Sequence, residues 1–175
     1  IGTRNIIEWF PESQIILAST CKACDPETVY GASKLIAERE VLGAGGSVAR
    51  LYNTVETQGN VFEIWQNNID IDGQKNYTPS IDVATSCRRY FMSVDEAVGL
   101  LLSTPFFPAG RWTIGPMVQR SMMQIGNVLY PDVVQHSIEP RRGDRVIEPL
   151  HAQSERLVPF ISNFMEIVSS HDPNV

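Results

Sequence analysis

Two side chains that can share a proton, Tyr30 and Lys34, lie four residues apart in the sequence. On an α-helix this spacing puts both side chains on one face. An ammonium group beside a phenol stabilises the phenolate, which can remove the proton from a sugar or alcohol hydroxyl as hydride leaves the carbon. The same pattern is also typical of two surface residues on a solvated helix, so the surrounding elements must decide between the two interpretations.

The elements around this pair predict alternating strands and helices. Residues 14–20 are typical of a strand buried on both faces, residues 29–42 of a helix ended by glycines, and residues 47–52 of a second short strand. Such alternation indicates a parallel α/β sheet. Doubly wound sheets bind ligands at the carboxyl ends of their strands, and Tyr30 opens the helix that follows one of these ends. This placement favours the chemical interpretation.

The second half of the chain carries further element signals. Ser93 starts a capping-box pattern and Ser121 a similar one, so helices are predicted after both serines. Strands are predicted over residues 111–114 and 134–138, and the apolar side chains of residues 159–169 share one broad face. We find no repeat, low-complexity segment or linker.

Length and composition indicate a folded protein. The 175 residues are 43% hydrophobic and 19% charged, enough for a packed core. The net charge of -6 argues against nucleic-acid partners. No run approaches the ~18 apolar residues that span a bilayer, and the chain starts without Met or a signal-peptide pattern, so we expect a piece of a longer protein. Three cysteines favour a reducing, cytoplasmic compartment over a disulfide scaffold.

Four segments along the chain form a recognisable series. They are Ser19-Thr20-Cys21-Lys22-Ala23 with Pro26 and Val29-Tyr30-Gly31-Ala32-Ser33-Lys34-Leu35-Ile36-Ala37-Glu38-Arg39, Arg50-Leu51-Tyr52-Asn53 with Gln58-Gly59-Asn60-Val61, Arg89-Tyr90-Phe91-Met92-Ser93-Val94-Asp95-Glu96-Ala97, and Pro140-Arg141-Arg142-Gly143-Asp144. Together these segments resemble the extended short-chain dehydrogenases/reductases, and most strongly the CapD-like polysaccharide-biosynthesis proteins, the UDP-N-acetylglucosamine 4,6-dehydratases. The resemblance covers most of the chain, and four matches in the family's order are more specific than any one of them.

The resemblance implies a fold and an activity. The fold is a partial Rossmann-type doubly wound parallel sheet with a smaller C-terminal substrate-binding lobe. Residues 1–60 then belong to the Rossmann-type domain, and residues 61–175 mostly to the lobe, with some segments returning to the sheet. The full-length protein is expected to be a lyase that uses NAD or NADP on a UDP-sugar. The chain alone is expected to be inactive, and to associate with itself or with a missing N-terminal half.

The resemblance also implies roles for single residues. Tyr30 serves the oxidation of the sugar's 4-hydroxyl group, and a base such as Lys22 takes the C5 proton. An acid protonates the departing 6-hydroxyl group, and hydride returns to C6. The implied catalytic residues are Tyr30, Lys34, Lys22, Cys21 and Thr20, of which Tyr30 and Lys34 also bind the cofactor, and the implied substrate-binding residues are Asn53, Arg89 and Arg141.

Two departures from the family pattern keep alternatives open. The Gly-x-x-Gly-x-x-Gly turn that cradles a pyrophosphate does not occur in the chain, and Cys21 stands where the family has an aspartate. A thiol is a weaker acid than a carboxyl group. A 4-epimerase, a catalytically weakened nucleotide-sugar-binding protein and a partner-binding module therefore remain alternatives. Cys21 and Cys24 are also spaced as in a redox pair or half a zinc site, but no second ligand pair with metal-like spacing follows, and we expect no metal.

Overall fold

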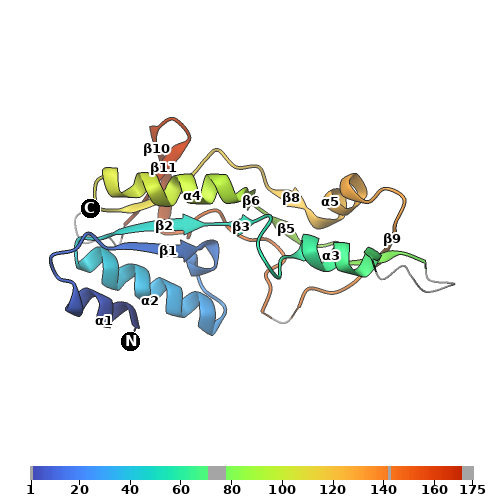
Figure 1. The fold of residues 1–175 in the computed structure, drawn as a ribbon, viewed down its shortest axis with the longest axis horizontal. Coiled ribbons are helices and arrows are strands. Elements are labelled where there is room, and N and C mark those ends of the chain that lie inside the picture. Colours follow the sequence, from blue (N-terminus) through green and yellow to red (C-terminus); the bar gives the residue numbers. More distant parts are fainter. Residues whose placement is uncertain (1, 71–77, 142, 171–175) are drawn as a thin grey trace. The chain divides into compact units, whose positions relative to one another are not determined.

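The computed structural model describes residues 2–70, 78–141 and 143–170 (Figure 1). These residues belong to two compact units: Ile1–Tyr52, Asp95–Met117 and Pro149–Val175 form the first, and Asn53–Val94 and Val118–Glu148 form the second. The assignment of residues 61–175 to a substrate-binding lobe stays a prediction.

The first unit contains a five-stranded mixed sheet. Its strands lie in the order β1-β2-β7-β11-β10, and β1, β2 and β7 are parallel, whereas β11 and β10 are antiparallel additions. Figure 1 shows α1 and α2 on one side of these strands and α4 on the other. The predicted doubly wound α/β sheet is therefore confirmed. The elements of this unit are α1 (Gly2–Trp9), β1 (Ile16–Thr20), η1 (Cys21–Ala23), α2 (Val29–Gly43), β2 (Ser47–Leu51), α4 (Val94–Ser103, whose first residue belongs to the second unit), η2 (Thr104–Phe106), β7 (Arg111–Ile114), β10 (Glu155–Ile161) and β11 (Phe164–Ser169).

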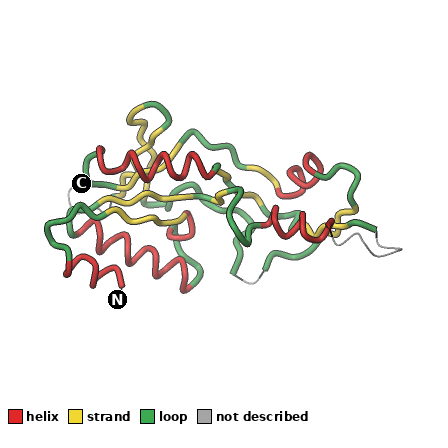
Figure 2. The backbone as a smooth tube through the Cα atoms, viewed as in Figure 1, coloured by secondary structure: helices red, strands yellow, loops and turns green. Residues whose placement is uncertain are grey.

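Helix α2 begins and ends where the sequence predicts. The side-chain oxygen of Thr28 accepts a hydrogen bond of 3.1 Å from the backbone N–H of Gly31, which caps the first turn. The helix ends at Gly43, and Gly45 adopts a φ of +78°, a left-handed conformation that residues with a Cβ rarely adopt. Figure 2 shows this helix beside the strands of the first unit.

The core of the first unit centres on β2 and β7. Val48, Ala49 and Trp112 are buried there. The expectation that β1 is buried on both faces is wrong, because Ala18 is exposed and Leu17 is only half-buried. Among the described residues β1 pairs only with β2, so within this part of the chain it lies at an edge of the sheet.

The second unit is built from short paired strands and two helices. Its strands pair as β3 with β6, β4 with β9 and β5 with β8, and a cluster that includes Trp65, Ile81 and Met122 forms its core. Ser121 precedes a helix as predicted, although its side chain makes no capping bond. The elements are β3 (Asn53–Thr54), α3 (Val61–Asp70), β4 (Ser80–Val83), β5 (Arg88–Arg89), β6 (Phe91–Met92), β8 (Arg120–Ser121), α5 (Met122–Leu129) and β9 (Val134–Ser137).

Candidate active site

The predicted phenol–ammonium pair lies in the first turns of α2. Tyr30 is 53% exposed, and the Lys34 Nζ atom lies 6.0 Å from the centroid of its ring. The same Nζ donates a hydrogen bond of 3.4 Å to the backbone oxygen of Ala18 in β1. The i, i+4 spacing therefore places both groups on one helix face, next to the strand that precedes the helix. The phenol of Tyr30 is therefore accessible from solvent.

The segment directly after β1 carries the other predicted catalytic residues. Thr20 caps the short helix η1, and its side-chain oxygen accepts from the Lys22 backbone N–H at 3.4 Å. The Cys21 side chain is buried, with its Sγ atom 3.9 Å from the Thr20 Oγ1 atom. Lys22 is half-buried. Burial of the thiol restricts its access to a substrate.

A glycine in α2, Gly31, allows this segment to pack closely against the helix. A Cβ atom added at Gly31 would lie 2.2 Å from the backbone oxygen of Lys22, far inside any allowed contact. Helix α2 therefore approaches η1 so closely that a side chain larger than that of glycine does not fit at this position. The structure brings all five predicted catalytic residues to the carboxyl end of β1 within the first unit.

The predicted substrate-binding residues lie in the second unit, where Asn53 and Arg89 share one partner. The Asn53 Nδ2 atom donates to the backbone oxygen of Tyr90 at 2.9 Å and to Oε2 of Glu148 at 2.6 Å. The Arg89 Nε atom lies 3.5 Å from Oε1 of the same carboxylate. Arg141 is exposed in the loop that precedes Glu148.

The Arg89 guanidinium group faces acceptors of the protein itself. Its Nη1 atom donates to the backbone oxygens of Arg88 and Val146, at 3.0 and 3.3 Å, and its Nη2 atom lies 3.5 Å from the Cys87 sulfur. Only 11% of the side chain is exposed. This geometry ties the loop before Glu148 to β5. Glu148, the shared partner, carries no signal in the sequence, because its role depends on residues far from it along the chain.

The cysteine spacing does not produce a reactive thiol pair. Cys21 and Cys24 are both buried, and they form no disulfide with each other. Burial raises the pKa of the Cys24 thiol to about 12, and the opposing effect of Arg50, whose Nη1 atom lies 3.3 Å from the sulfur, is smaller. A thiol with a raised pKa is a poor nucleophile and metal ligand, which argues against a redox pair.

In the described ranges, no three His, Cys, Asp or Glu side chains are grouped so that they could bind a metal ion. Nor does any helix in those ranges have both the length and the apolar character needed to cross a membrane.

Three parallel strands with helices on both sides, and a tyrosine–lysine helix that follows the carboxyl end of one of them, define a Rossmann-type α/β protein. Within this class the chain belongs to the family described as polysaccharide biosynthesis protein, whose model matches residues 1–159. The resemblance read from the four motif segments is thereby confirmed.

Known proteins support the same assignment. A UDP-N-acetylglucosamine 4,6-dehydratase (inverting) from Campylobacter jejuni is 27% identical over 160 residues, which cover 84% of this chain and 47% of the relative. Among solved structures, Pen from Bacillus thuringiensis matches 97% of this chain and 57% of its own, with a TM-score of 0.80 and 21% identity. DesIV, a dTDP-glucose 4,6-dehydratase from Streptomyces venezuelae solved with NAD and TYD bound, matches 85% and 55%, with a TM-score of 0.69 and 15% identity. The two structures confirm the fold, and the chain spans about half the length of these proteins.

Proposed function

We propose that this chain is the catalytic and substrate-binding part of a longer enzyme that dehydrates a nucleotide sugar, with UDP-N-acetylglucosamine as the substrate. The observation that carries the proposal is the Tyr30–Lys34 pair on one face of α2, beside the carboxyl end of β1. The family membership supports a role in polysaccharide biosynthesis, and the Campylobacter relative supports dehydration as the reaction type.

In this proposal each catalytic side chain moves or holds a proton. Tyr30 accepts the proton of the sugar's 4-hydroxyl group, and Lys34 favours the phenolate that this step needs. Lys22 takes the C5 proton, Cys21 donates a proton to the departing 6-hydroxyl group, which leaves as water, and C5 regains a proton at the end. Thr20 orients this segment, because its side chain caps η1. In the second unit, Asn53 and the exposed Arg141 are the proposed contacts to the nucleotide sugar, with Arg89 holding the loop that carries Arg141.

The cofactor we propose for the full-length protein is NAD or NADP. When bound, the cofactor would supply the hydride chemistry of the reaction, namely the uptake of hydride from C4 and its return to C6. Tyr30 and Lys34 suit its reactive end, because the phenol is exposed and the ammonium group lies beside it at the end of the strand. The pyrophosphate-binding glycine turn does not occur in this chain, so we expect the chain alone to bind NAD weakly.

A second candidate function rests on Cys21. Cys21 is only 2% exposed and lies in η1, so its thiol is poorly placed to donate a proton to a leaving group. A 4-epimerase needs only the Tyr30–Lys34 pair, and a weakened nucleotide-sugar-binding protein needs no acid at all. We further propose a cytoplasmic location, which fits three cysteines that form no disulfide, and association through the edge of β1.

The product of the full-length protein distinguishes these functions. The protein is incubated with UDP-N-acetylglucosamine and NAD, and the nucleotide sugars are analysed by mass spectrometry and NMR. Dehydration lowers the substrate mass by one water, as we expect. Epimerisation leaves the mass unchanged and inverts C4, which would support the 4-epimerase. Binding without turnover would support the weakened protein.

A further inference from the structure

A buried carboxylate continues the face of α2 that carries the catalytic pair. Glu38 follows Lys34 by four residues and Tyr30 by eight, so the three side chains lie above one another on the helix surface. Tyr30 is exposed, Lys34 is half-buried and Glu38 is fully buried. The same helix face therefore runs from the surface into the interior of the first unit.

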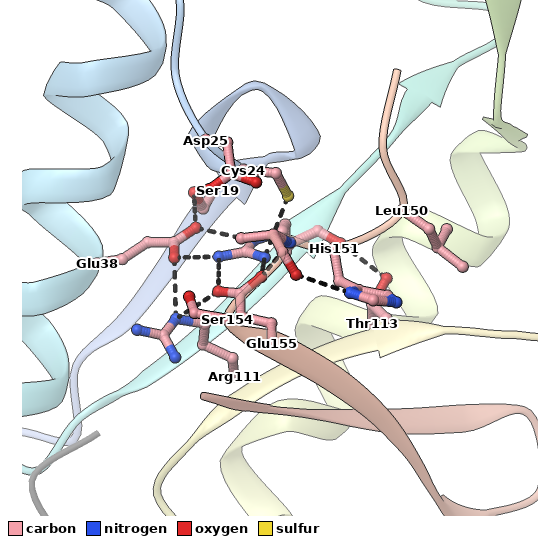
Figure 3. Close-up of polar contacts among 12 residues, drawn as sticks. Ser19, Cys24, Asp25, Glu38, Arg111, Thr113, Leu150, His151, Ser154 and Glu155 are labelled. Carbon is pink, nitrogen blue, oxygen red and sulfur yellow. Dashed lines mark hydrogen bonds and ion pairs between the residues drawn. The ribbon is translucent and has the colours of Figure 1, made fainter. Parts of the chain in front are cut away.

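The Glu38 carboxylate joins α2 to three neighbouring strands. It accepts from Ser19 Oγ in β1 at 2.5 Å, from Arg50 Nε and Nη2 in β2 at 3.1 and 2.6 Å, and from Arg111 Nε in β7 at 3.0 Å. Figure 3 shows Glu38, Arg111 and Ser19 around this cluster. One side chain thus fixes both the position of α2 over the sheet and the rotation of the helix about its axis.

The cluster contains a second carboxylate that does not belong to α2. Glu155 in β10 accepts from Arg50 Nη1 and Nη2 at 2.6 and 3.0 Å, and from the Ala152 backbone N–H at 2.8 Å. Its nearer oxygen lies 3.9 Å from Arg111 Nε. The two carboxylates and two guanidinium groups have balanced formal charges, so loss of either carboxylate leaves the same buried positive charge uncompensated. Glu155 is therefore a matched comparison for Glu38.

We propose that Glu38 is a positioning residue for Tyr30 and Lys34, and this proposal rests on the proposed function. Ser19, which donates to Glu38, stands between Ala18, whose carbonyl accepts from Lys34, and Thr20, which caps η1. A shift of α2 at Glu38 would move the phenol and the ammonium group relative to the segment that carries Lys22. Small displacements of reacting groups lower catalytic rates strongly.

The test compares Glu38→Gln with Glu155→Gln in the full-length protein. We expect Glu38→Gln to lower kcat at least about tenfold with KM changed less than about twofold, because positioning acts on the chemical step. Glu155→Gln should keep kcat within about twofold of wild type although it removes the same charge. Equal losses of kcat in both variants would overturn the proposal, because they would indicate a structural role only.

A second readout does not depend on activity. Hydrogen–deuterium exchange of the backbone amides in the first turns of α2 should accelerate in Glu38→Gln and not in Glu155→Gln. Equal exchange in the two variants would overturn the proposal. If the wild-type protein turns over no nucleotide sugar, the proposed function fails while this comparison still decides the role of Glu38.

A conservative variant covers the case in which Glu38→Gln does not fold. Glu38→Asp keeps the charge but withdraws the carboxylate by one methylene group, so it should fold and still show a lowered kcat and faster exchange at the start of α2. Wild-type kcat and exchange in Glu38→Asp would overturn the proposal.

Discussion

The side-chain amide of Asn53 and the carboxylate of Glu148 are joined by a hydrogen bond of 2.6 Å, from Nδ2 to Oε2. The second oxygen of the carboxylate lies 3.5 Å from the Arg89 Nε atom. Two of the three residues predicted to bind substrate, Asn53 and Arg89, therefore contact one buried acid, and the loop that carries the third, Arg141, ends at the same acid.

Replacement of Glu148 should destabilise the protein. Glu148→Gln removes the charge that Arg89 faces and weakens the Asn53 contact, and we expect a loss of about 1–3 kcal/mol in the free energy of unfolding. Urea unfolding measures this loss. The control is Glu139→Gln in the same loop region, where the glutamate is exposed and the expected change is below about 0.5 kcal/mol. Similar stabilities of the two variants would contradict the role of Glu148.

The Tyr30–Lys34 arrangement could be predicted from the sequence because it depends on helix geometry alone. Four residues separate the two, so any helix that includes them places them on one face. The start and the end of α2 depend on equally local features, because Thr28 and the glycines after residue 42 are close to the helix ends that they define.

Contacts between distant segments could not be predicted. Asn53 and Glu148 are 95 residues apart, and nothing near either one specifies the other. The burial of β1 also differs from what its apolar sequence indicates, because β1 pairs only with β2 among the described residues and is only partly buried. The apolar face of residues 159–169 has the spacing of a helix, and this expectation is wrong, because the segment lies in the antiparallel pair of β10 and β11.

Gly31 should be required for the packing of α2 against η1. Gly31→Ala places a methyl group against the Lys22 carbonyl, and overpacking of this kind costs about 1–3 kcal/mol. Gly99→Ala is the matched control, because Gly99 also lies inside a helix but has no atom within 4 Å of an added Cβ. We expect that control to gain about 0.5–1 kcal/mol from helix propensity. Thermal unfolding of both variants measures the difference, and a Gly31→Ala variant as stable as wild type would exclude the close approach.

The buried Cys24 thiol should make stability sensitive to alkaline pH. Burial raises its pKa from an ordinary 9.0 to about 12, so the folded protein holds this proton more tightly than the unfolded chain. The resulting stabilisation is complete below pH 9 and is lost as pH rises toward about 12. Urea unfolding between pH 8 and pH 11 should show a steeper decline for the wild type than for Cys24→Ala. Parallel declines would show that Cys24 does not contribute.

The open edge of β1 should cause the isolated chain to associate. No described strand pairs with β1 on the side away from β2, so another strand can add there, beside the half-buried Leu17. Sedimentation velocity at micromolar concentration should detect dimers or larger species. Ala18→Lys, which adds a charge at an exposed position of this edge, should reduce association. A wild-type chain that stays monomeric with a cooperative thermal transition would contradict this expectation.

The most direct test of the proposed function is the reaction of the full-length protein with UDP-N-acetylglucosamine in D₂O. Dehydration removes the C5 proton and later returns a solvent-derived one, so the product should be a 4-keto-6-deoxy sugar with deuterium at C5. Tyr30→Phe should abolish this product while the variant remains folded, because it lacks the hydroxyl that accepts the 4-hydroxyl proton. A product without deuterium at C5, or full activity in Tyr30→Phe, would contradict the account.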